Sequence, residues 1–211
     1  MQADTGTKPN AAAPEAILHP GSRHLFSYWN ALRGDRTAPG RNEIELRALM
    51  PILPWLGIVE RQARSRRHRW RLAGTGIGRL WGTGLTGAAV AADWAEVYRH
   101  ALVRALDGVC ERRQPFVARL KATSAEGEVL GIELFAAPVE AAMEGDNGGA
   151  VQTLCSVLPF RDPQWLGHVP LVDIELSTLT ALWLGPLPDE ISRLQGPVAP
   201  QLRVIRGGRS D

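Results

Sequence analysis

The sequence contains little cysteine, no long apolar run and no apolar segment at its start. Its two cysteines, Cys110 and Cys155, stand far apart and outside any CxxC spacing, which argues against a disulfide framework and a cysteine-based zinc site. The first residues, MQADTGTKPNAAAPEAI, lack the basic start and apolar core of a secretory signal. No stretch approaches the roughly 20 apolar residues of a membrane-spanning helix. We therefore expect a cytoplasmic protein with no membrane span.

The chain also has almost no net charge. Its formal net charge is +2, and charged residues make up 22% of it, so overall charge does not point to nucleic acid or a membrane. The one local excess is the run RQARSRRHRWR, which could track phosphates with Trp70 as a stacking platform. The alternative is a charged hairpin tip with Trp70 on its packed side. We expect nucleic-acid binding to be the weaker interpretation and an anionic or protein partner the stronger one. The arginines of this run are Arg61, Arg64, Arg66, Arg67, Arg69 and Arg71.

The N-terminal part predicts a disordered lead followed by two helices. Residues 1–20 lack hydrophobic periodicity. Helical periodicity begins at Ser22, which can cap a helix that Gly34 ends. A second, short helix follows from Asn42 and stops at Pro51. The apolar positions are Leu25, Phe26, Trp29 and Leu32 in the first helix, and Ile44, Leu46, Leu49 and Met50 in the second.

The middle of the chain predicts two strands, a glycine-rich crossing and one long helix. Residues 55–62 and 68–73 have strand character, and the polar residues between them fit a hairpin. Six glycines then interrupt residues 74–87, which favours short helical turns and tight crossings. Asp93 can cap a helix over residues 93–113. Its apolar stripe comprises Trp94, Val97, Tyr98, Ala101, Leu102, Ala105, Leu106 and Val109.

Residues 116–138 predict a hairpin with a defined register. With its turn centred on Glu126, the opposed pairs are Leu120 with Ile132, Ala118 with Leu134 and Arg119 with Glu133. The first two pairs share an apolar face, and the third places opposite charges across the other face. Because packing and charge agree on one register, the pattern favours this hairpin.

The remaining segments predict one more strand and a tail. Residues 150–159 supply a fifth strand, and residues 161–211 form a proline-rich tail with too few apolar residues for a core of its own. The domain scheme is then a lead over 1–20, a domain over 21–160 that includes the N-terminal helices, and a tail over 161–211. The fold class is α+β, with a five-stranded antiparallel sheet and helices on one face.

This order of elements resembles the PAS domain family, in particular the small stand-alone PAS proteins of alphaproteobacteria. The segments that carry the resemblance are YWNALRGDRTAPGRNEIELRALMPILPWLGIVE, RWRLAGTGIGRLWGTGLTG and QPFVARL, within residues 22–160. The resemblance implies a sensory or regulatory module that binds small ligands or dimerises. It implies no catalytic residues.

The sequence gives little support for a cofactor or for catalysis. Gly74–Gly78 resembles a nucleotide-binding loop, but Arg79 stands where the third glycine of GxGxxG belongs, and no parallel partner strand follows. A haem ligand at His100 would fall nearly opposite the apolar stripe of its helix, and the crossing has no cysteine for a photoactive flavin. We expect no cofactor, no metal site and no enzymatic activity.

Any ligand pocket should lie between the sheet and the crossing helices. Its candidate residues, for which plain core is the favoured interpretation over a ligand site, are Leu80, Trp81, Leu85, Trp94, Tyr98, Leu120 and Ile132. The leading hypothesis is a non-catalytic module that signals through a protein partner or as a homodimer, through the helix that carries Trp29 or an exposed sheet face. The alternative is a small-molecule binding protein with an apolar pocket.

Overall fold

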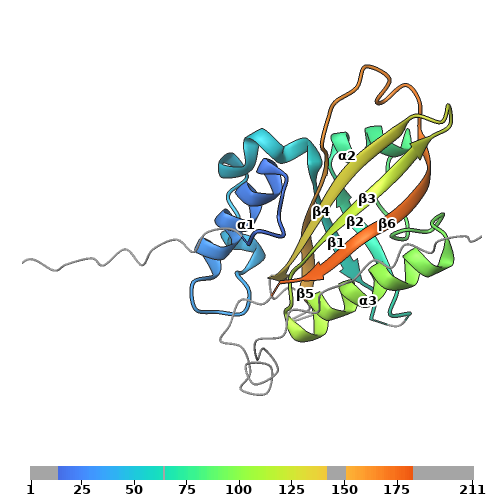
Figure 1. Ribbon diagram of the computed structural model, residues 1–211. Helices are drawn as coiled ribbons and strands as arrows, with labels where there is room; N and C mark the ends of the chain where they lie inside the picture. The colour runs from blue at the N-terminus through green and yellow to red at the C-terminus, as the bar shows by residue number, and fades with distance from the viewer. Residues whose placement is uncertain (1–13, 64, 142–150, 183–211) are drawn as a thin grey trace, which may run out of the picture.

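The computed structural model describes residues 14–63, 65–141 and 151–182 (Figure 1). Helices and strands alternate along the chain in the expected broad order, with two 3₁₀ segments, η1 and η2, between the first helix and the first strand. The elements are α1 (Pro20–Arg33), η1 (Arg41–Glu43), η2 (Leu46–Trp55), β1 (Leu56–Arg61), β2 (His68–Ala73), α2 (Thr75–Trp81), α3 (Glu96–Arg112), β3 (Phe116–Ser124), β4 (Val129–Glu140), β5 (Val151–Pro159) and β6 (Leu171–Ala181).

The helix ends differ from their predictions in three places. Helix α1 starts two residues before Ser22, because Pro20 suits the first helical position and the Nδ1 atom of His19 accepts a hydrogen bond from Gly21 N–H. Helix α3 begins after Ala95 rather than at Asp93. The prolines expected to stop the second helix lie inside η2, which continues to Trp55.

The strands form one antiparallel sheet in the order β2-β1-β5-β4-β3-β6. The α+β class is confirmed, but the expected five strands are six, because β6 pairs along the whole of β3. Residues 171–181, which we assigned to the tail, therefore belong to the sheet. Residues 183–211 of that tail lie outside the described part of the chain.

The β3–β4 hairpin has the predicted register. Leu120 lies opposite Ile132, and Arg119 lies opposite Glu133. The hydrogen bonds of the charged pair, however, run to the N-terminal segment: Glu133 accepts N–H groups from residues 18 and 19, and Arg119 donates to the carbonyl oxygen of Ala16. The charges opposed across the strands thus anchor a third piece of chain.

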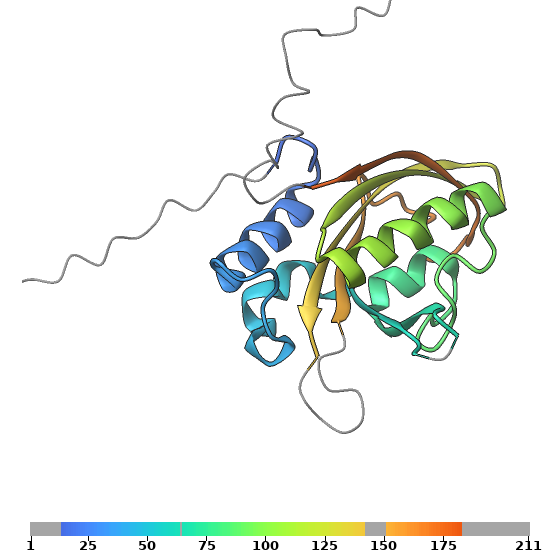
Figure 2. The ribbon, with the colours of Figure 1, turned by 90° about the horizontal axis from the view of Figure 1, so that it is seen from below.

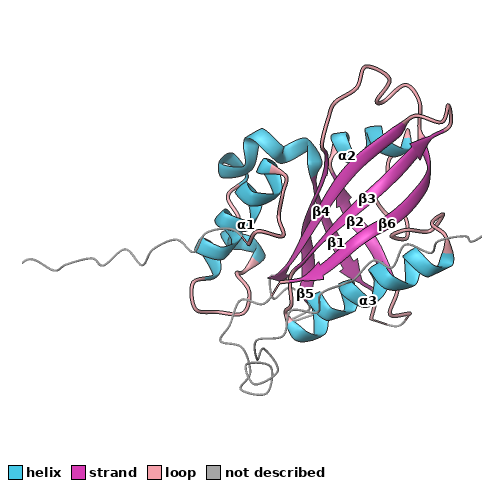
Figure 3. Cartoon of the chain, viewed as in Figure 1, coloured by secondary structure: helices cyan, strands magenta, loops and turns pink. Residues whose placement is uncertain are grey.

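Helices cover both faces of the sheet, not one face as predicted. Helix α1 and the 3₁₀ segments pack on one face, and α2 and α3 pack on the other, so that the strands lie between two helical layers (Figures 2 and 3). In β4, Phe135 and Val139 face α1, whereas Ile132 and Leu134 face α3. Because successive strand residues point to opposite faces, a strand this apolar needs cover on both.

The N-terminal lead is shorter than predicted. Ile17 is fully buried in the core beside α1, and Glu133, also fully buried, accepts the Leu18 and His19 N–H groups at 2.9 Å each. Residues 14–20 are therefore part of the domain. Residues 1–13 lie outside the described part of the chain.

The apolar face of α1 packs against the sheet of the same chain. Trp29 is 1% exposed, and its indole N–H donates to the carbonyl oxygen of Pro138 at 2.8 Å. Phe26 packs edge-on against Phe135 of β4. The sheet therefore occupies the apolar face of the helix that carries Trp29, and the expected dimer contact through this helix stays a prediction.

We predict that Glu133→Ala detaches the N-terminal segment. The change leaves two N–H groups without their charged acceptor, which should lower the free energy of unfolding by about 2–3 kcal/mol. Denaturant titration measures that loss, and hydrogen exchange should rise first at residues 17–30. The exposed carboxylate of Glu175 provides a control, because Glu175→Ala should leave both measurements almost unchanged. Equal effects of the two substitutions would contradict the anchoring role.

Candidate functional site

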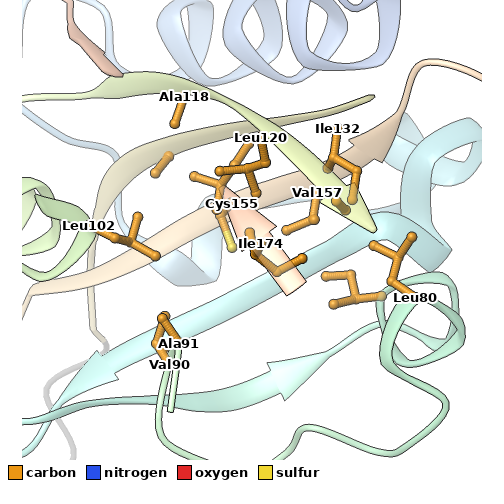
Figure 4. Close-up of a cluster of buried hydrophobic side chains, with 14 of the residues drawn as sticks. Leu80, Val90, Ala91, Leu102, Ala118, Leu120, Ile132, Cys155, Val157 and Ile174 are labelled. Atoms are coloured by element: carbon orange, nitrogen blue, oxygen red, sulfur yellow. The ribbon is translucent and has the colours of Figure 1, made fainter. Parts of the chain in front are cut away.

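A small apolar cavity lies between the sheet and the connection from α2 to α3. Its volume is about 80 Å³, and three tryptophans contribute to its wall. Side chains from the sheet, from both helices and from residues 90 and 91 converge on this region (Figure 4). The lining residues are Trp70, Trp81, Leu85, Ala88, Ala89, Val90, Ala91, Ala92, Asp93, Trp94, Leu102, Leu120, Leu134 and Val157.

Four of the seven predicted pocket residues line this cavity. They are Trp81, Leu85, Trp94 and Leu120. Leu80 and Ile132 are fully buried in the adjoining core, and Tyr98 is half-buried on α3 outside the cavity lining. The structure thus brings most of the set together, and its ligand-binding role stays a prediction.

Sequence reasoning missed the 88–92 segment, which forms much of the cavity wall. This segment runs along the free edge of β2: Trp70 N–H donates to Ala88, and Val90 N–H donates to His68. Ala91 has a φ of +56°, which is costly for a residue with a Cβ atom. The run AAVAA has no periodicity that would have revealed it. The placement of Trp70 on the packed side was the one available signal.

The glycine-rich crossing serves close packing rather than phosphate binding. A Cβ atom on Gly74 would lie 2.2 Å from the carbonyl oxygen of Pro54, and one on Gly76 would lie 2.7 Å from the Trp55 ring. Only glycine allows α2 to approach η2 this closely. Gly74 and Gly76 therefore serve the tight turn that the sequence predicted beside the sheet.

A cluster of charged side chains, called here the ionic clip, joins the β1–β2 hairpin to α3. Arg61 contacts both Asp107 and Glu111, and Glu111 also contacts Arg66 at 2.8 Å. His68 Nε2 lies 3.0 Å from the Asp107 carboxylate. The arginine run is therefore largely neutralised by carboxylates of the same chain.

Two further arginines of the run, Arg69 and Arg71, lie on the exposed side of β2. Arg69 and Arg71 both contact Glu60, at 2.8 and 3.2 Å. Arg64 lies outside the described part of the chain. Because Trp70 is 5% exposed, it offers no stacking platform to a nucleic acid.

His68 is the buried member of the ionic clip. Its side chain is 1% exposed, and burial lowers its pKa below the usual 6.5, against the opposing effect of the Asp107 carboxylate. The neutral ring therefore donates Nε2–H to Asp107. Its Nδ1 atom is buried and has no hydrogen-bond partner among the described residues.

The cysteines and the remaining histidines do not form a reactive centre with the cavity. Burial raises the pKa of the Cys155 thiol to about 12, and burial also raises the pKa of the Cys110 thiol, so both thiols stay protonated. The His100 side chain is 65% exposed. Within residues 14–63, 65–141 and 151–182, no group of three or more His, Cys, Asp or Glu side chains could hold a metal ion.

Comparison with known proteins gives one family match. A family model described as a PAS domain matches residues 17–149. No curated protein matches the chain. The matched segment begins at Ile17, the first fully buried residue of the described chain. None of the described helices is long and apolar enough to cross a membrane.

We predict that stability falls as the pH drops through about 6.5. The pKa of His68 is lower in the folded chain than its usual value, so the unfolded chain binds more protons and stability is lost on acidification. His19 acts in the same direction, because burial lowers its pKa too. Urea unfolding between pH 7.5 and 5.5 measures the loss.

His68→Gln should flatten this pH dependence, and His19→Gln should flatten it further. His100→Gln provides the control, because that side chain is exposed. An unchanged slope in the His68 variant would show that this ring does not titrate as described.

Proposed function

The chain belongs to the PAS domain family, and on this premise we propose that it is a non-catalytic sensory or regulatory module that acts through contact with a protein partner. The partner we favour is a second copy of the chain. The observation that carries the proposal is an exposed apolar surface on η2, on the side of the molecule where α1 covers the sheet.

This surface, called here the η2 patch, comprises Leu46, Ala48, Met50 and Pro51. Leu46 is 58% and Met50 60% exposed, whereas Leu49 between them is fully buried. Apolar side chains so exposed lose contact with water when a partner covers them, and methionine adapts readily to a partner surface.

Charge complementarity supports a second copy as the occupant of the η2 patch. Glu45 and Arg47 flank Leu46, and both are exposed. In a two-fold symmetric contact, each surface meets its own copy, so Glu45 of one chain can face Arg47 of the other. One short segment thus supplies both apolar contact and opposite charges.

A small apolar ligand in the cavity is the proposed input. The cavity is apolar, and among the described residues Asp93 is the one ionisable group in its lining, which supports binding rather than chemistry. Its volume of about 80 Å³ is below the roughly 150 Å³ of an engineered cavity that holds benzene. A larger ligand requires movement of the exposed, glycine-containing segment after α2. Neither haem nor flavin fits this volume.

The compartment we propose is the cytoplasm. Cys110 and Cys155 are both free thiols, which supports a reducing environment. The alternative function, a small-molecule binding protein, is favoured by the same apolar cavity and differs in having no protein partner.

We predict a concentration-dependent dimer that the η2 patch holds together. Light scattering after size-exclusion chromatography should give twice the 23.0 kDa chain mass at high concentration. The double substitution Leu46→Glu and Met50→Glu should weaken dimerisation at least tenfold, because it places charges in the apolar contact.

Val97 offers the matched control, since it is 67% exposed on α3 and Val97→Glu should leave the dimer intact. Deleting residues 1–40 is not a usable test, because it strips α1 from the sheet. A monomer at every concentration would overturn the second-copy proposal.

We also predict that cavity occupancy depends on Val157. Native mass spectrometry of the purified chain should show a reproducible bound mass of a small apolar compound. Val157→Phe should abolish it, because the larger side chain enters the cavity from β5. Val117→Ile, on the opposite face of the sheet, should retain it. A wild-type protein free of bound mass, and unchanged in melting temperature by benzene, would remove the ligand from the proposal.

A further inference from the structure

A second concave site lies outside the apolar cavity, between the β1–β2 turn, the 88–92 segment and α3. Its volume is about 400 Å³, within the range of sites for small organic molecules. Arg66, Arg67 and Arg99 line it, together with His68 and His100. We call this site the basic groove.

Cations outnumber carboxylates around the basic groove. Arg66 shares the Glu111 carboxylate with Arg61. Arg67 and Arg99 have no carboxylate contact among the described residues, and Arg99 donates only to the carbonyl oxygen of Ala92, at 3.5 Å. The other nearby carboxylates are already engaged: Asp107 contacts Arg61 and His68, and Glu96 lies at the rim, 3.7 Å from His100. Among the described residues, the guanidinium groups of Arg67 and Arg99 thus have no carboxylate partner.

His68 brings a buried nitrogen atom without a hydrogen-bond partner among the described residues to the wall of the basic groove. His68 lines the basic groove, its side chain is 1% exposed, and Nδ1 has no partner in the described part of the chain. Leaving a buried polar atom unsatisfied is costly. An anion bound in the groove favours the protonated imidazole ring, in which both ring nitrogens are donors.

We propose that the basic groove binds a small organic oxyanion, with the oxyanion held by Arg67 and Arg99 and an apolar part against Val90 and Val103. Guanidinium groups suit this chemistry, because their paired N–H groups match phosphate and carboxylate oxygens. Val90 and Val103 line the same site as the arginines. Phosphate and carboxylate share this recognition, and the test below separates them.

A long polyanion fits the surface less well than a small anion. Outside the groove, Arg69 and Arg71 are paired with Glu60, so the cationic surface does not continue along β2. Binding along a nucleic acid needs several free cations in a row and exposed aromatic rings. Among the described arginines of the run, Arg67 is the one without a carboxylate contact, and it lies in the groove.

Titration of the full chain with phenyl phosphate at constant ionic strength tests the proposal. Two-dimensional ¹H–¹⁵N NMR should show saturable shifts at residues 66–68, 89–92 and 99–103. Inorganic phosphate should bind at least tenfold more weakly, because it lacks the apolar part. Benzoate shows whether a carboxylate replaces phosphate, and neutral benzyl alcohol should produce no saturable shift in the groove.

The double substitution Arg67→Gln and Arg99→Gln should weaken phenyl phosphate binding at least tenfold. Because Arg99 contacts Ala92, Arg67→Gln alone serves as a second variant that leaves that contact in place. Arg104→Gln, exposed on α3 but outside the groove lining, is the matched control and should bind as the wild type does. Phenyl phosphate should also raise the NMR-measured pKa of His68 in the wild type.

Each remaining outcome counts against the groove. Non-saturable shifts, equal weakening by Arg104→Gln, or benzyl alcohol binding as tightly as phenyl phosphate would overturn the proposal. If these variants still dimerise, their loss of phenyl phosphate binding is independent of the η2 patch.

Discussion

The fold depends on a sheet that is apolar on both faces. In β4 and β5 nearly every residue is buried, and strand geometry sends alternate side chains to opposite faces. One helical layer therefore cannot complete the domain. The second layer, α1 with η2, is held by Trp29 at Pro138 and by Glu133 at the 18–19 backbone. The apolar face of α1 is thus buried against the sheet, whereas η2 in the same layer exposes the apolar side chains of Leu46 and Met50.

The charged side chains of the β1–β2 hairpin are likewise mostly paired within the chain. The arginine run is dense in sequence, yet Glu60, Asp107 and Glu111 neutralise most of what the structure describes of it. Carboxylates on α3 draw one side of the hairpin inward, and Glu60 on β1 holds the other. What remains is local: Arg67 and Arg99 beside a buried histidine. A cationic sequence motif therefore becomes a single concave site rather than a charged surface.

Sequence reasoning succeeded where a segment had a clear hydrophobic periodicity and also a neighbouring segment with which it could pair. Leu120 and Ile132 could be paired because two alternating strands joined by a short turn allow one register in which packing and charge agree. It failed at β6, whose outward residues, such as Thr178 and Thr180, mix with apolar ones at an exposed edge. It failed at Ile17 because one buried residue has no periodicity. Four of the fourteen residues that line the cavity were in the predicted set, but residues 88–92 gave no signal.

The 88–92 segment links the two proposed sites physically. Ala89, Val90 and Ala92 line both the apolar cavity and the basic groove, so one stretch of backbone is a wall of each. It is held to β2 by hydrogen bonds at Trp70 and His68, and Ala91 within it adopts a left-handed conformation that stores conformational energy. Because interiors are close-packed, this wall cannot move toward one site without changing the shape of the other. Occupancy of the groove and occupancy of the cavity therefore act on the same backbone.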